Sequence, residues 1–251
     1  MNICLFEKSQ IDLPLSFDDE RGAHILNVLH KKQGDDFTAG IIGGQSGVAK
    51  ITRIDETARQ IFFEFKPTGD GKPLKPLKMI IGFPRPIQLK RLLRDIAALG
   101  ISEVHLTGTE LGEKSYMQSD LAQPEKAREL LLEGTVQAGS THVPKVFIHK
   151  SLKECLSTLE ETGSLSLSKG KQNFICLDNI NPKRALGDVS FSKEVPGIAA
   201  IGSERGWTDR ERELLELSDF IRCGMGTRIM RTETAATVAG AIILNSMGVL
   251  E

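Results

Sequence analysis

The segment CGMGTRIMRTETAATVAGAIIL, residues 223–244, places glycines, two arginines and a cluster of hydroxyl and carboxylate groups directly before an apolar run. The glycines allow the backbone to pass close to a ligand, and Arg228 and Arg231 add permanent positive charge beside them. Residues 232–234, Thr-Glu-Thr, stand where a helix is expected to begin, and a helix start leaves backbone N–H groups unpaired. This combination favours a binding site; a capped helix with two solvated arginines is the alternative.

The elements that must position this segment alternate in character from residue 78 onward. Short apolar runs, expected to be strands, are separated by segments with apolar residues at three- and four-residue spacing, expected to be helices. The expected strands are 78–82, 103–106, 145–148, 174–177, 197–201 and 220–222, and the expected helices are 88–99, 124–137, 152–159, 208–217 and 232–247. Strands separated by helices imply a parallel sheet covered on both faces.

Three of these strands are followed by short polar or glycine-containing turns. A parallel sheet brings such turns to one edge, and open α/β sheets bind their ligands at that edge. Short glycine loops can hold an adenine through backbone hydrogen bonds and aliphatic walls. The turns are 177–178, 201–206 and 225–229, and the aliphatic residues at them are Leu177, Ile201, Ile229 and Met230. Three ordinary turns without a ligand are the alternative.

The first part of the chain has a different pattern. One helix is expected at 23–29, and β-rich apolar runs at 37–42, 47–54 and 60–65 favour a small β-barrel over a helical bundle. Residues 67–78 are rich in proline, glycine and lysine, a composition typical of a linker. The expected domains are therefore residues 1–70 and residues 77–251.

Composition excludes several classes of protein. The chain has 251 residues, 40% of them hydrophobic, and a net charge of −1, so overall charge neither supports nor excludes an RNA partner. The four cysteines and five histidines show no spacing that predicts a metal site, a disulfide scaffold or a catalytic triad. A secretory signal and a membrane span are both missing from the sequence pattern. We therefore expect a cytoplasmic protein without a bound metal.

Two segments partly resemble phosphate-binding motifs but do not match them. GTELGEKS, residues 108–115, has the wrong spacing for a phosphate loop, and CGMGTR, residues 223–228, lacks the third glycine and the position of a dinucleotide fingerprint. The sequence also contains no Gly-x-Ser-x-Gly motif. These comparisons argue against a nucleotide hydrolase, a dehydrogenase and an esterase.

Longer motifs resemble a known family. MGTRIMRTETA, residues 225–235, closely resembles the LGxRILRTETA motif of the small-subunit rRNA uridine methyltransferases of RsmE type, in the SPOUT superfamily. IGSERGWTDRERELL, residues 201–215, resembles the IGPEGG motif and acidic helix of that family. Residues 24–37, 91–104 and 136–144 resemble its HxxxVLRxxxGD, ELGV and EQSxRxxVP segments in the same order. The resemblance thus covers both expected domains.

The chain departs from the family motifs at identifiable positions. Ser203 and Arg205 replace the proline and the first glycine of IGPEGG, and Val136 and Ser140 replace the glutamate and arginine of EQSxR. His30 stands where the family has an arginine after the VL pair, so at least two arginines expected to contact RNA are missing. The cofactor assignment is therefore better supported than the choice of RNA.

The resemblance implies an α/β fold: a C-terminal SPOUT methyltransferase domain with a trefoil knot, preceded by a small PUA-like, RNA-binding β-barrel. It implies S-adenosylmethionine as the cofactor and methyl transfer to N-3 of a uridine in 16S rRNA of the assembled small ribosomal subunit. It also implies a homodimer formed through the knotted domain. Another RNA target, or a non-catalytic role as an RNA-binding assembly factor, are the alternatives.

The resemblance and the chemistry together give a set of site residues. Methylation at N-3 requires loss of the imide proton and stabilisation of negative charge on the pyrimidine. Arg231 is the candidate for orienting or stabilising the uracil, and Glu233 for holding the loop or accepting the proton; alternatively, Glu233 caps the helix and pairs with Arg228 or Arg231. The expected cofactor-binding residues are Leu177, Ile201, Gly202, Ser203, Glu204, Gly206, Met225, Gly226, Arg228, Ile229, Met230 and Thr232.

A basic path is expected to contact RNA phosphates. Such contacts position RNA without reading its sequence. The residues are His24, Lys31 and Lys32 in the first domain and Arg85, Lys90 and Arg91 in the second. A solvated helix face is the alternative for any single one of them.

Overall fold

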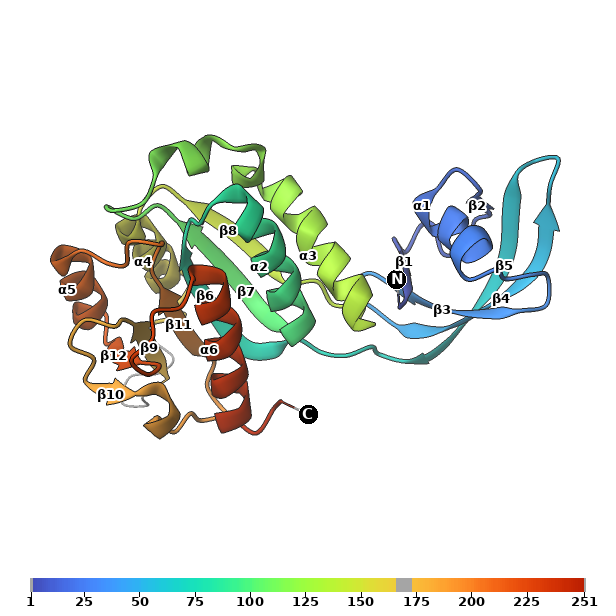
Figure 1. Ribbon diagram of the computed structural model, residues 1–251. Helices are drawn as coiled ribbons and strands as arrows, with labels where there is room; N and C mark the ends of the chain where they lie inside the picture. Colours follow the sequence, from blue (N-terminus) through green and yellow to red (C-terminus); the bar gives the residue numbers. More distant parts are fainter. Residues whose placement is uncertain (1, 166–172, 251) are drawn as a thin grey trace. The chain divides into compact units, whose positions relative to one another are not determined.

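The computed structural model describes residues 2–165 and 173–250. The chain forms two compact units (Figure 1). The N-terminal unit contains residues 1–73 and 135–143, and the C-terminal unit contains residues 74–134 and 144–251.

The N-terminal unit is built on a mixed sheet of five strands in the order β1-β3-β4-β5-β2. The strands are β1 (Cys4–Phe6), β2 (Leu15–Ser16), β3 (Asp36–Ile41), β4 (Ser46–Asp55) and β5 (Gln60–Gly69). Inward residues alternate along the strands, and the fully buried Ala39, Ala49, Ile51 and Ile61 form the core with Phe6 and Ile25. The sheet curls around this core, as expected for a barrel-like domain.

The expected helix in this unit begins earlier than its sequence pattern indicates. It consists of α1 (Glu20–Ala23) and a π-helical turn, η1 (His24–Val28). Asp19 caps α1, because its side chain accepts a hydrogen bond from the Arg21 backbone N–H at 2.9 Å.

The expected linker is wrong at both ends. β5 continues to Gly69, and β6 (Lys75–Gly82) already begins at Lys75, so two of the prolines lie within strands. Pro67 pairs with Gly47 next to a register shift in β4, and Pro76 lies at the irregularity between Lys75 and Lys78. Proline is tolerated at such irregular positions because no ladder hydrogen bond is required of it there.

A second segment completes the N-terminal unit. Residues 135–143 include the last turn of α3 (Pro124–Ala138) and the loop that follows it. Thr141 Oγ1 donates to the Gly44 carbonyl at 2.6 Å, and Ser140 Oγ donates to the Lys72 carbonyl at 3.1 Å. Ser140, at the place of a family arginine, thus has a local structural role.

The C-terminal unit is built on a parallel sheet of seven strands in the order β10-β12-β9-β11-β6-β7-β8. Its further strands are β7 (Ile101–Thr107), β8 (Lys145–His149), β9 (Phe174–Leu177), β10 (Arg184–Ala185), β11 (Gly197–Ile201) and β12 (Ile221–Gly224). All pairs are parallel, and β11 lies between β9 and β6 although it follows both in the chain. The late strand β11 is therefore inserted into the middle of the sheet, whereas β12 and β10 extend it at one edge.

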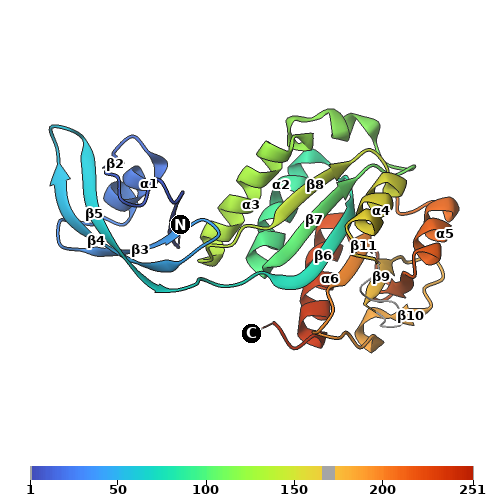
Figure 2. The same cartoon turned by 180° about the vertical axis from the view of Figure 1, so that it is seen from behind.

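Helices cover both faces of this sheet, as the alternating pattern predicts (Figures 1 and 2). The long helices are α2 (Pro86–Leu99), α3, α4 (Leu152–Glu161), α5 (Asp209–Leu217) and α6 (Thr232–Ser246), and the short 3₁₀ turns are η2 (Lys114–Gln118), η3 (Asp120–Ala122) and η4 (Leu186–Asp188). α2 and α6 pack together against one face, whereas α4 and α5 cover the opposite face. The fifteen-residue α6 can pack closely against the sheet and α2, because its buried face consists mostly of alanines, Gly240 and aliphatic side chains.

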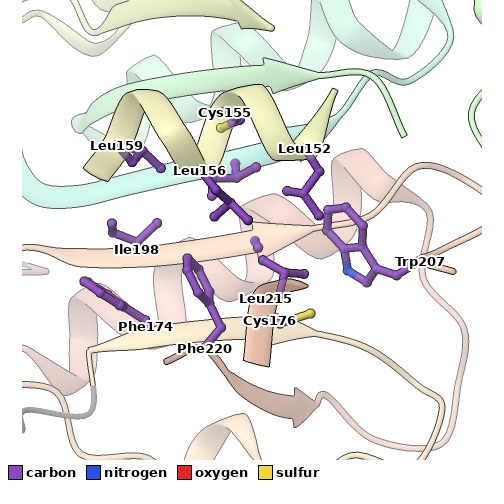
Figure 3. Packing of buried hydrophobic residues seen from close by; sticks show 12 residues of the cluster. Leu152, Cys155, Leu156, Leu159, Phe174, Cys176, Ile198, Trp207, Leu215 and Phe220 are labelled. Carbon is purple, nitrogen blue, oxygen red and sulfur yellow. The ribbon is translucent and has the colours of Figure 1, made fainter. Parts of the chain in front are cut away.

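The core under α4 and α5 is shown in Figure 3. Leu152 and Leu156 of α4 and Leu215 of α5 meet the strands at Ile198 and Cys176. Trp207 is 1% exposed at the border of this cluster, where its Nε1–H donates to the Leu177 carbonyl at 3.2 Å. This bond ties the core to the end of β9.

All four cysteines are buried, free thiols: Cys4, Cys155, Cys176 and Cys223. In the described part of the chain, none of the helices has the length and apolar character needed to cross a membrane.

Candidate functional site

The carboxyl ends of β9, β11 and β12 meet at one edge of the C-terminal sheet. Leu177 pairs with Ile201 on one side and with Cys223 on the other, so the three following loops start side by side. They enclose a cavity of about 310 Å³, which we call the loop cavity. Its lining is Leu177, Asp178, Asn179, Ile180, Ile201, Gly202, Ser203, Glu204, Arg205, Gly206, Arg212, Cys223, Met225, Gly226, Arg228, Ile229, Met230, Thr232 and Ala235. Every residue predicted to bind the cofactor lines this cavity.

Backbone geometry shapes the loop after β11. A Cβ on Gly82 would lie 2.3 Å from the Ser203 nitrogen, so only glycine at the end of β6 lets this loop pass so closely. Thr109 Oγ1 donates to Ser203 Oγ at 2.9 Å, and Thr232 Oγ1 donates to the Gly202 carbonyl at 3.2 Å. The loop is thus attached both to the segment after β7 and to the start of α6.

The lining of the loop cavity includes a buried ion pair. Arg212 Nε lies 2.5 Å from Asp178 Oδ2, and the two side chains are 9% and 2% exposed. The hydrogen bond to Asp178 is the main cause that raises the pKa of the Arg212 guanidinium. Asp178 Oδ1 also accepts the Ile180 backbone N–H at 3.0 Å. The pair therefore joins α5 to the turn after β9.

A second cavity of about 250 Å³ adjoins the loop cavity, because Glu204 and Arg205 line both. We call it the arginine cavity. It contains arginines from three segments of the chain, three carboxylates, a tyrosine and a glutamine. Its lining is Arg85, Gln88, Leu111, Glu113, Tyr116, Glu204, Arg205, Arg231 and Glu233.

One wall of the arginine cavity is the start of α2. Arg85, the residue before the helix, donates from Nε to the Tyr116 hydroxyl at 3.0 Å and from its backbone N–H to Glu204 Oε1 at 3.0 Å. Gln88, in the first turn, has a buried Oε1 atom without a hydrogen-bond partner among the described residues. Buried acceptors are normally paired, so this oxygen can accept a hydrogen bond from a water or a ligand in the cavity.

Arg231 and Glu233 both lie at the arginine cavity, at the start of α6. Arg231 is the N-cap residue of this helix and is exposed, whereas Glu233 is half-buried. The alternative role, in which Glu233 caps the helix and pairs with an arginine, stays open. The N-cap residue Arg231 makes no side-chain cap hydrogen bond, but Glu233 lies in the first turn, where a carboxylate stabilises a helix.

The residues predicted to contact RNA are divided between the two units. Of these, His24 and Lys31 are half-buried, and Lys32, Arg85, Lys90 and Arg91 are exposed. Arg85 alone among them lines the arginine cavity. Contact with RNA stays a prediction for all of them.

Sequence reasoning missed several residues at these cavities. The sequence pattern places Asp178 in a turn and gives no signal for Arg212, Gln88 and Tyr116. An acidic residue directly after an apolar strand is a signal that could have identified Asp178. Gln88 and Tyr116 come from a helix and a 3₁₀ turn whose meeting point no local pattern shows.

Comparison with known proteins identifies the class. Residues 71–244 match the family model of the RNA methyltransferase domain. The chain is 44% identical to the ribosomal RNA small subunit methyltransferase E of Treponema pallidum, over 97% of this chain and 91% of the relative. It is 31% identical to the ribosomal RNA small subunit methyltransferase E 1 of Borreliella burgdorferi, over 98% of both. The chain therefore belongs to the RNA methyltransferase family, in the group of the ribosomal RNA small subunit methyltransferases E.

Solved structures agree with this assignment at the level of fold. The ribosomal RNA small subunit methyltransferase E from Neisseria gonorrhoeae, solved with S-adenosyl methionine bound, is 20% identical and superposes with a TM-score of 0.76, over 98% of this chain and 97% of that one. A probable rRNA methyltransferase from Porphyromonas gingivalis also gives 0.76, at 18% identity and 99% coverage of both chains. The predicted fold class, an α/β C-terminal domain with a parallel sheet preceded in the chain by a barrel-like N-terminal domain, is confirmed.

Proposed function

We propose that this protein transfers the methyl group of S-adenosylmethionine to N-3 of a uridine in 16S rRNA. The observation that carries the proposal is the pair of adjoining cavities, of which one fits a cofactor and the other a nucleobase. Family membership and the names of the curated relatives support an rRNA substrate. The resemblance described above implies the assembled small subunit, a homodimer and a cytoplasmic location, and these stay predictions.

The loop cavity fits an adenosyl cofactor in size and in chemistry. About 310 Å³ lies within the range of small-molecule sites. Leu177, Ile201 and Met230 provide apolar walls for an adenine, and the backbone of the loops provides hydrogen-bonding groups around it. S-adenosylmethionine supplies an electrophilic methyl group when bound. Glu204 and Arg205 then separate the cofactor from the arginine cavity, where the acceptor base is expected.

The arginine cavity fits a flipped nucleotide. Arg85 and Arg205 offer charge for phosphate, and Tyr116 offers a ring against which a base can stack. Loss of the N-3 proton places negative charge on the pyrimidine oxygens, which Arg231 can stabilise from the start of α6. Glu233 is the carboxylate on the same turn that can accept the proton or hold Arg231 in place.

The proposal is tested by identifying the product. The purified protein is incubated with labelled S-adenosylmethionine and small ribosomal subunits that lack the modification, and the digested rRNA is analysed by mass spectrometry beside an N-3-methyluridine standard. We expect one labelled nucleoside that co-elutes with this standard. A label in ribose or in another base would reject the proposed chemistry. A label only in an RNA other than 16S rRNA would reject the proposed substrate.

Gln88 provides a second prediction about the same reaction. Replacing it by methionine keeps the length and helix preference of the side chain but removes both polar groups. If Gln88 contacts the uracil edge, kcat/KM for small subunits should fall about 3- to 10-fold, the value of one neutral hydrogen bond. Cofactor affinity, measured by calorimetry, should not change, because Gln88 does not line the loop cavity.

The matched control for Gln88→Met is Gln118→Met. Gln118 is an exposed residue of η2 that lines neither cavity. Equal kcat/KM values for the two variants would show that Gln88 takes no part in recognition of the base.

A further inference from the structure

A buried cluster of two histidines and one cysteine lies under α4, on the face of the sheet that this helix covers. His105 in β7 and His149 at the end of β8 point to the same side, because Thr107 pairs with His149 and His105 with Phe147. Cys155 projects from the first turns of α4 onto these strands. The exposed fractions of the three residues are 2%, 5% and 0%.

The nitrogen and sulfur atoms of this cluster converge. His105 Nδ1 lies 3.0 Å from His149 Nε2. One ligand atom from each of His105, His149 and Cys155 can be chosen such that all lie within 4.8 Å of one another. In tetrahedral zinc sites, bond lengths of about 2.0–2.3 Å place neighbouring ligand atoms about 3.3–3.7 Å apart. The two nitrogens are slightly closer than this spacing, and any wider separation in the cluster, up to 4.8 Å, must close when the metal binds.

A second observation concerns the other nitrogen of His105. Its Nε2 is buried without a hydrogen-bond partner within normal distance among the described residues, yet Glu103 Oε2 lies 3.4 Å away. Lys78 Nζ holds the same carboxylate oxygen at 2.8 Å. Metal-bound histidines usually direct their free N–H to a carboxylate, which fixes the tautomer. His105 has this arrangement already, with Nδ1 toward the cluster and Nε2 toward Glu103.

From this arrangement we infer that His105, His149 and Cys155 form a zinc site in the C-terminal unit, with a water molecule as the fourth ligand and Glu103 as the carboxylate behind His105. Imidazole nitrogen and thiolate sulfur are the ligands that zinc prefers, and zinc needs no redox partner in this position. The site is distinct from both cavities, since none of its ligands lines either of them. It would join β7, β8 and α4.

Cys155 must lose its thiol proton to bind zinc. Burial raises the pKa of the Cys155 thiol to about 12, so a metal-free cluster would hold it as an unreactive S–H group. Binding of Zn²⁺ releases this proton to solvent and forms a Zn–S bond, without oxidation or reduction.

The test measures metal directly. The full chain, without a histidine tag, is produced in zinc-supplemented medium, passed through a chelator and analysed by mass spectrometry of elements. We expect about one zinc per chain. Cys155→Ser and His149→Gln should lose it, whereas Cys176→Ser, a change of another buried thiol, should retain it. Refolding in Co²⁺ should give a thiolate-to-cobalt absorption band that Cys155→Ser lacks.

A further variant keeps the test decisive if the ligand variants do not fold. Glu103→Gln leaves all three ligands in place and should weaken zinc retention about 10- to 100-fold in competition with a coloured chelator. If the wild-type chain holds no zinc and gives no cobalt band after refolding, the cluster is a hydrogen-bonded imidazole pair beside an ordinary core thiol. Equal zinc contents in wild type and a folded Cys155→Ser variant would lead to the same conclusion.

Discussion

Replacing Arg231 by alanine is expected to lower kcat for rRNA methylation about 10²- to 10³-fold, the usual effect of removing one preorganised donor to a developing oxyanion. Arg231 lines the arginine cavity but not the loop cavity, so the Kd for S-adenosylmethionine should stay as in the wild type. Single-turnover transfer of labelled methyl groups to saturating small subunits measures the chemical step, and calorimetry measures the Kd.

Two further variants make this result specific. Arg231→Lys keeps the charge but not the planar fork of donors, and should recover only part of the rate. Arg128→Ala removes an exposed arginine of α3 that lies at neither cavity, and should leave kcat unchanged. If Arg231→Ala retains wild-type kcat, the charge on the pyrimidine is stabilised elsewhere, and the role proposed for this residue is wrong.

Replacing Arg212 by methionine is expected to destabilise the protein by about 3–5 kcal/mol, because a buried carboxylate would lose its partner. The Asp178 side chain is 2% exposed and would keep the Ile180 N–H as its remaining donor. The contact between Arg212 and Asp209 adds little, since the Asp209 side chain is fully solvated. Urea unfolding followed by circular dichroism gives the free energy of unfolding.

The same helix offers the control for this measurement. Arg210 in α5 has an exposed side chain that lies 3.7 Å from Glu110, and Arg210→Met should cost no more than about 1 kcal/mol. The double variant Asp178→Asn with Arg212→Met removes both charges and should regain a large part of the lost stability. Equal urea midpoints for Arg212→Met and Arg210→Met would show that the buried pair contributes nothing to stability.

The cofactor side of the site was predictable because it depends on strand order alone. Once 174–177, 197–201 and 220–222 are recognised as parallel strands, their following loops must share an edge, and the residues of those loops line one cavity in the structure. Residues 225–235 also carry a long motif whose polar and apolar positions are fixed by the turn into α6. The local motif and the strand order therefore predict the same cofactor site.

The remaining features arise from contacts between distant segments. β1, β2 and β10 are two or three residues long and form only because a longer neighbouring strand supplies their hydrogen bonds. His105 and His149 are 44 residues apart in the chain, so no ligand spacing reveals that they meet. Gln88 could be read only as a polar position of an amphipathic helix, because its unpaired oxygen exists only in the folded state.

The return of residues 135–143 to the N-terminal unit has an evolutionary consequence. A module encoded by one uninterrupted stretch can be exchanged between genes by a single recombination event. Here Ser140 and Thr141 carry hydrogen bonds that the first 73 residues need, yet they are encoded within the methyltransferase portion. Exchanging the N-terminal unit for another would leave these partners behind, so the two portions are expected to be inherited together.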